Sequence, residues 1–147
     1  MGYALFAQKK LVLSGLINSV NLQQAQRSDE QTRLATNTLT LQSRVTNTQA
    51  GQSAELSVLY NELASAEDST ERESINNIID ARQALFDSEI AEINQQIYQT
   101  SIKENAIEME VKRLDTKLSA LKKQLESIEQ AESDGIEKST PKFKGVG

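Results

Sequence analysis

Two pairs of carboxylates are the groups in this chain best suited to acid–base chemistry or to binding a divalent cation: Glu108 with Glu110, and Glu71 with Glu73. On a helix, residues two apart do not share a face, so these carboxylates should diverge into solvent. The chain contains no Cys and no His, which removes thiolate nucleophiles, Cys-ligated zinc and the commonest general base. We therefore expect no enzyme, cofactor, metal or small-molecule substrate.

The composition of the 147 residues favours an elongated helical protein. One Pro and six aromatic residues fit poorly with a compact globule that needs many sharp turns. Ser, Thr, Asn and Gln number 48, so the expected solvated surface is polar but weakly charged. The net charge is -5, and no Lys/Arg-rich run or aromatic platform is present, which argues against nucleic-acid binding.

The second half of the chain carries a heptad repeat over six repeats. Apolar residues alternate spacings of four and three from Phe86 onward, and only Thr100 and Glu104 are polar at the seam positions. This regularity predicts a coiled coil rather than one amphipathic helix of a globular bundle, which would drift toward a period of 3.6. The predicted seam comprises Ile90, Ile93, Ile97, Ile107, Val111, Leu114, Leu118, Leu121, Leu125 and Ile128.

The first half carries a weaker form of the same repeat. Its apolar row fails between Gln24 and Gln31 and recovers from Leu34. After Val45 the repeat slips by one residue, and the slip coincides with Gly51. Since Gly costs about 1 kcal/mol relative to Ala inside a helix, we expect a bend or break near residues 49–52.

The segment 67–74 contains no apolar residue and is interpreted as the turn between two arms. Thr70, followed three residues later by Glu73, predicts a capping box at the start of the second helix. Ser133, Asp134 and Gly135 resemble a helix stop, and the only Pro follows them. The expected organisation is a first arm at 1–66, a turn at 67–69, a second arm at 70–132 and an irregular, flexible tail at 133–147.

Equal arms around one short turn predict an all-α, long antiparallel helical hairpin or coiled coil, with arms of about 60 residues. Folding the chain about the turn places Val45 near Ile93 and Val20 near Leu118. It also places Arg33 opposite Glu104, a candidate ion pair that would fix the register. One long extended dimer, in which 67–74 continues as helix, is the alternative.

Apolar residues outside the seam are concentrated near the N-terminus. The seam between the two helices would not bury them, so they need a further surface to pack against. A helix that is apolar on several sides is usually buried, so this segment predicts self-association or binding of a helical protein. A tighter bundle made by folding at Gly51 and weak binding to a membrane surface are alternatives. A thinner second row follows the other arm at Ile78, Leu85, Tyr98, Ile102 and Met109. The predicted contact residues are Leu5, Phe6, Val12, Leu13, Leu16, Ile17 and Val20.

The first twenty residues do not form a typical signal peptide, because no basic residue precedes the apolar ones and Lys9 and Lys10 interrupt them. No run approaches the roughly 18 apolar residues needed to span a bilayer. We therefore expect a cytoplasmic protein, or one exported without a cleavable signal peptide.

The lack of Cys, His and Trp, the single Pro, and a surface rich in Gln, Asn, Ser and Thr make the chain similar in composition to subunits of secreted bacterial filaments, such as flagellin and type III secretion needle proteins. No motif of those families is matched, so no functional residues are implied. The leading hypothesis is a non-enzymatic structural protein that self-assembles, as in a secreted or surface bacterial assembly. The alternative is a coiled-coil adaptor or chaperone-like module that binds one specific protein partner.

Overall fold

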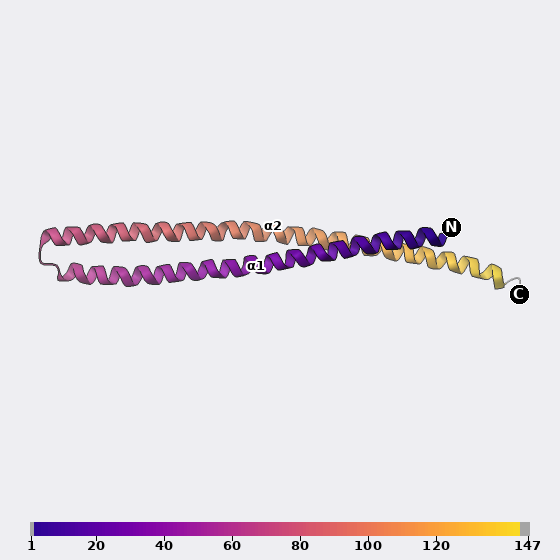
Figure 1. Ribbon diagram of the computed structural model, residues 1–147, viewed down its shortest axis with the longest axis horizontal. Helices are drawn as coiled ribbons and strands as arrows, with labels where there is room; N and C mark the ends of the chain where they lie inside the picture. The colour runs from indigo at the N-terminus through magenta and orange to yellow at the C-terminus, as the bar shows by residue number, and fades with distance from the viewer. Residues whose placement is uncertain (1, 145–147) are drawn as a thin grey trace. The chain divides into compact units, whose positions relative to one another are not determined.

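The computed structural model describes the backbone of residues 2–144 and the side chains of residues 3–135. It contains two long helices, α1 (Gly2–Ser65) and α2 (Ser69–Lys144), joined by a short turn (Figure 1). No strand occurs among the described residues. The predicted all-α antiparallel hairpin is confirmed, and the chain reverses direction rather than continuing as one extended helix.

The hairpin divides into two compact units, each made of a segment of α1 and a segment of α2. Unit 1 combines Met1–Gln31 with Ala106–Gly147. Unit 2 is the continuous stretch Thr32–Asn105, which includes the turn. In unit 2 the two helical segments run side by side in opposite directions away from that turn (Figure 1).

Unit 1 is held together by an apolar cluster between its two helical segments. Leu13 and Val20 of α1 are buried against Leu114 and Leu121 of α2. Fully burying one such aliphatic side chain contributes about 1.5–3 kcal/mol to folding, so these contacts dominate the stability of the unit. Four partly buried residues extend the cluster along both helices: Ile17, Leu118, Leu125 and Ile128.

Unit 2 has its densest apolar cluster beside the turn. Ala66, Ile75 and Ile79 are buried there, and Leu56, Leu59 and Leu63 pack against them. Further from the turn, Leu41 and Ile93 are buried, together with the polar residue Thr100. The Thr100 hydroxyl donates a 2.9 Å hydrogen bond to the backbone carbonyl of Gln96, so its burial leaves no unpaired donor.

The two helices of unit 2 change phase together. In α1, eleven residues separate the partly buried Val45 from the partly buried Leu56, and in α2 eleven residues separate Ile79 from Ile90. An eleven-residue step is a heptad with four extra residues, which locally unwinds a coiled coil without ending the helix. Accordingly α1 continues as helix through 49–52, and the predicted break near Gly51 is wrong.

The turn is fixed by polar contacts with the ends of both helices. The Asp68 carboxylate accepts a 3.2 Å hydrogen bond from the Thr70 amide, and the Asp68 carbonyl accepts the first helical bond from the Arg72 amide. Arg72 Nε in turn donates to the carbonyl of Ala66, just past the end of α1, at 2.8 Å. Asp68 is therefore the cap of α2. The predicted cap of Thr70 with Glu73 is wrong, since both residues already lie inside the helix.

The C-terminal segment differs from the prediction as well. Helix α2 runs through Ser133, Asp134 and Gly135 and ends at Lys144, so residues 133–144 are helical rather than irregular. A glycine ends a helix when it adopts a left-handed conformation, and no described glycine has a positive φ. In a right-handed helix Gly135 costs only about 1 kcal/mol, which a long helix tolerates. The remaining predicted tail residues, 145–147, lie outside the described residues.

Two isoleucines of α2 test whether stability resides in the seam. Ile93 exposes 2% of its surface and Ile102 exposes 51%. We expect Ile93→Ala to lower the free energy of unfolding by about 2–5 kcal/mol, because it removes buried methyl groups and leaves a cavity. Ile102→Ala is the matched control, with an expected change within about 0.5 kcal/mol. Urea titration followed by circular dichroism at one protein concentration measures both variants. Equal losses of unfolding free energy would contradict the claim that the seam residues supply the stability.

The cap of α2 gives a second prediction. Asp68→Ala should cost about 1 kcal/mol, because the Thr70 amide loses its acceptor at the helix start. Asp68→Asn should retain most of that stability, since Asn caps as well as Asp. Thr70→Ala should be nearly neutral by the same urea titration. A larger loss for Thr70→Ala than for Asp68→Ala would restore Thr70 as the cap.

Candidate interaction surface

The ten predicted seam residues of α2 lie between the two helices. Ile93, Ile107, Leu114 and Leu121 are buried. The other six are partly buried: Ile90, Ile97, Val111, Leu118, Leu125 and Ile128. The seam is consequently occupied by the chain's own α1, and binding of any partner must use other residues.

The seven predicted contact residues near the N-terminus divide into two groups. Leu13 and Val20 are buried, and Phe6 and Ile17 are partly buried. Leu5, Val12 and Leu16 expose 52%, 56% and 44% of their surfaces. Only this second group is exposed to solvent. The surface available for contact is therefore smaller than the seven-residue surface predicted from the sequence.

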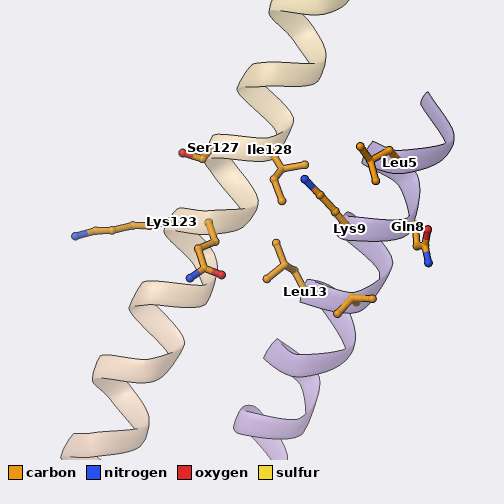
Figure 2. Close-up of a pocket in the computed structure, with 9 residues that line it drawn as sticks. Leu5, Gln8, Lys9, Leu13, Lys123, Ser127 and Ile128 are labelled. Atoms are coloured by element: carbon orange, nitrogen blue, oxygen red, sulfur yellow. The ribbon is translucent and has the colours of Figure 1, made fainter. Parts of the chain in front are cut away.

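An open groove of about 780 Å³ lies beside these exposed residues in unit 1. Its apolar lining comes from Leu5, Val12 and Leu13 of α1 and from Ile128 of α2. Leu13 and Ile128 point toward one another from the two helices, which makes an apolar floor (Figure 2). The rest of the lining is polar: Gln8, Lys9, Lys123, Gln124 and Ser127.

The spacing of the α1 residues explains why they share one side of the helix. Leu5, Lys9, Val12 and Leu16 are separated by four, three and four residues, which is the spacing of a coiled-coil seam. This second row therefore lies beside the row that faces α2. Lys9 extends from it across the space between the helices toward Ile128 (Figure 2). The groove is thus an apolar trough with a cationic rim.

The charges around the groove are uneven. Its lining includes Lys9 and Lys123 but no carboxylate, and in the described part of the chain neither lysine forms an ion pair. Lys10, by contrast, pairs with Glu132, and this hydrogen bond raises the pKa of Lys10 above its ordinary value. Lys9, which extends between the two helices, is therefore a cation with no acidic partner among the described residues (Figure 2).

Gln24 and Arg27, which interrupt the apolar row of α1, have polar partners within unit 1. Gln24 Nε2 donates to Asp115, and Arg27 binds Glu30 at 2.6 Å and Glu110 at 3.1 Å. The hydrogen bond to Glu30, followed by the charge of Glu110, raises the pKa of Arg27. These contacts join α1 to α2 in unit 1 and help to fix which residues of the two helices face each other.

The carboxylate pairs singled out for chemistry do not act together. Glu110 is bound by Arg27 and lies 4.0 Å from Arg113, whereas Glu108 pairs with Lys112 at 3.5 Å. Glu71 and Glu73 are both exposed to solvent. Among the described residues, no group of three or more acidic side chains could hold a metal ion.

The predicted Arg33–Glu104 pair does not form. Glu104 instead accepts a 2.9 Å hydrogen bond from the hydroxyl of Thr38, and Arg33 is exposed. The cross-helix contacts Gln24–Asp115 and Arg27–Glu110 were missed by the sequence analysis. Polar residues at seam positions were their only signal, and that signal does not specify which long side chain will reach which partner.

Comparison of the chain with protein-family models, curated proteins and solved structures finds no match. None of the described helical segments is long and apolar enough to cross a membrane. The features of the described residues that bear on function are therefore the groove and the exposed apolar rows.

Adjacent residues of α1 test the division between seam and surface. Leu13→Glu should unfold unit 1 or destabilise it by several kcal/mol, because a carboxylate is forced into an apolar cluster. Val12→Glu should leave helicity and urea stability of the dilute chain nearly unchanged. Circular dichroism of the two variants makes the comparison, and similar collapse of both would place Val12 in the internal core.

Proposed function

We propose that this chain is a non-enzymatic structural protein that assembles with copies of itself through the exposed apolar rows beside its seam. The observation that carries the proposal is the exposed set Leu5, Val12 and Leu16 next to a groove floored by Leu13 and Ile128. A groove between two helices, bordered by apolar side chains at coiled-coil spacing, suits a third helix that lays its own apolar face into it.

The energetics favour repeated contacts over a single tight one. Burying the exposed half of one aliphatic side chain contributes about 1 kcal/mol. Association itself costs several kcal/mol in lost translational and rotational freedom. One patch of three such side chains therefore gives weak binding, and a stable assembly needs several contacts for each subunit.

A secreted or surface bacterial assembly is the setting we propose for this activity. The chain has no Cys, and its six aromatic residues and single Pro present few bulky or rigid obstacles to unfolding and passage through a narrow channel. A hairpin of this kind would recover its full apolar contacts by stacking with copies of itself. The similarity in composition to secreted filament subunits supports the same setting.

An adaptor that binds one helical partner is the second candidate. The observation in its favour is the groove, which would receive a helix of a different protein equally well in shape. The two functions differ in what the pure protein does. A self-assembling subunit grows with its own concentration, whereas an adaptor remains a small defined species until its partner is added.

Size-exclusion chromatography with light scattering over a wide concentration range tests the proposal. We expect growth from a 16.3 kDa species to large particles. Val12→Glu combined with Leu16→Glu should abolish this growth, because two charges enter the contact surface, and the helicity of the dilute chain should be unchanged. Leu39→Glu is the control, since Leu39 is also exposed but belongs to unit 2 and does not line the groove.

A fixed monomer or dimer at every concentration would overturn self-assembly and favour the adaptor. Equal loss of assembly in the Leu39→Glu control would show that the effect comes from added charge rather than from this surface.

A further inference from the structure

We propose that unit 1 opens while unit 2 stays folded, so that the groove exists only in the closed form of the chain. Unit 1 is made of two segments, Met1–Gln31 and Ala106–Gly147, which we call the outer segments. In the open form the outer segments separate from each other. The opening does not depend on the proposed function, whereas its effect on assembly rests on that function.

The order of segments along the chain makes the opening one-way. The outer segments are joined only through unit 2, which is one continuous stretch, Thr32–Asn105. The two helical parts of unit 2 are joined by the short turn between Ser65 and Ser69. A folded unit 2 therefore holds the outer segments near each other, which gives them a high effective concentration for their contact.

Unit 1 loses this advantage when unit 2 unfolds. The outer segments would then have to close a loop containing all of 32–105, and the entropic cost of closure rises with loop length. Unit 2 has no such dependence on unit 1. When unit 1 opens, Asp68 still caps α2, Arg72 still binds the Ala66 carbonyl, and the apolar cluster beside the turn stays buried.

The burial pattern of α1 provides a place for the opening to stop. Val20 exposes 2% of its surface and Leu41 exposes 5%, and no residue between them is buried. An opening that ends in this stretch therefore exposes little apolar surface at its boundary and leaves Leu41 buried. All but one of the partly buried residues in the stretch are polar: Gln24, Arg27, Glu30, Gln31, Leu34 and Thr38.

The polar contacts of unit 1 do little to oppose the opening. Arg27 and Glu110 form an ion pair at 3.1 Å, but their side chains are 38% and 32% exposed. Ion pairs this exposed contribute little to stability, because water screens them and two long side chains lose rotamer freedom. The hydrogen bond from Gln24 to Asp115 is also exposed. The apolar cluster of unit 1 is thus what keeps the outer segments together.

The groove depends on the closed form, because both outer segments line it. Its floor joins Leu13 of α1 to Ile128 of α2 (Figure 2). When the outer segments separate, Leu5, Val12 and Leu13 remain on one helix and Ile128 on the other. An open copy therefore has no groove to receive a third helix. Binding that requires the groove shifts the equilibrium toward the closed form, so assembly and closure stabilise each other.

Hydrogen exchange of the backbone amides tests the opening, at a concentration where light scattering shows only the smallest species. Amides of 13–20 and 114–121 should exchange about tenfold or more faster than those of 75–79 and 90–93, because opening of unit 1 suffices to expose them. Equal protection of both sets would mean that the hairpin opens as one unit, which would overturn the inference.

Two matched variants test the order of the steps. Leu114 in unit 1 and Ile79 in unit 2 each expose 4% of their surface. Ile79→Ala should speed exchange in unit 2 about tenfold or more and leave exchange in unit 1 unchanged, because unit 1 opens without disturbing Ile79. Leu114→Ala should speed exchange in both units, because complete unfolding includes the opening of unit 1.

Two results would contradict this order. If Ile79→Ala speeds exchange in both units equally, the chain unfolds in one step. If Leu114→Ala speeds exchange in unit 1 alone, the two units unfold independently and the opening is not one-way.

A covalent link across the outer segments provides a second test. The chain has no Cys, so Lys10→Cys with Glu132→Cys introduces one pair of thiols where two side chains form an ion pair. A bis-maleimide with a spacer as long as the two replaced side chains should join them and hold unit 1 closed. Exchange in unit 1 should then be slower than in the same variant without the link. Unchanged exchange after linking would overturn the inference.

The linked variant also separates this inference from the proposed function. In urea just sufficient to open unit 1, the unlinked variant should lose assembly and the linked one should keep it, as measured by light scattering. If both lose assembly together, the opening does not control assembly. If the unmodified chain never assembles at any concentration, the proposed function is overturned, and hydrogen exchange still decides whether unit 1 opens.

Discussion

The fold depends on a single apolar seam, because each helix has only one neighbouring helix in the hairpin. Among the described side chains the buried apolar residues lie where α1 meets α2, with no second layer behind them. A globular protein can lose one contact and keep others around it, but here each seam residue packs against a small local group. Among the described side chains, the same constraint leaves the large apolar residues outside the seam exposed, and the proposed function uses these residues.

A seam of this length persists only if the two helices stay in phase. The eleven-residue steps between Val45 and Leu56 in α1 and between Ile79 and Ile90 in α2 occur at corresponding distances from the turn. A step in one helix alone would rotate its apolar row away from its partner. Because both helices change together, the buried rows continue to face each other on either side of the step.

The fold and the seam were predictable because they depend on the heptad spacing of apolar residues, which recurs many times along the sequence. The limits of the elements depend on single residues, and these predictions failed. Asp68 rather than Thr70 caps α2, and Gly135 does not end it. The pairing of long polar side chains was also predicted incorrectly, since Glu104 accepts a hydrogen bond from Thr38 and does not pair with Arg33. For the contact surface, the heptad positions already placed Leu5, Val12 and Leu16 outside the seam, and the packing agrees, but the predicted set of seven was too broad because its other four residues lie in the seam.

The polar groups of the hairpin differ in whether the chain itself supplies their partners, and this difference supports the proposed binding role. Arg27, Lys10 and Thr100 have partners within the chain, so their polarity is used in holding the hairpin together. Lys9 and Lys123 lie beside an apolar trough, and they form no ion pair among the described residues. A surface that combines exposed aliphatic side chains with uncompensated charge gains free energy when a complementary surface covers it. Since one such contact is weak, its effect becomes large only when many copies repeat it, which is the property expected of an assembling subunit.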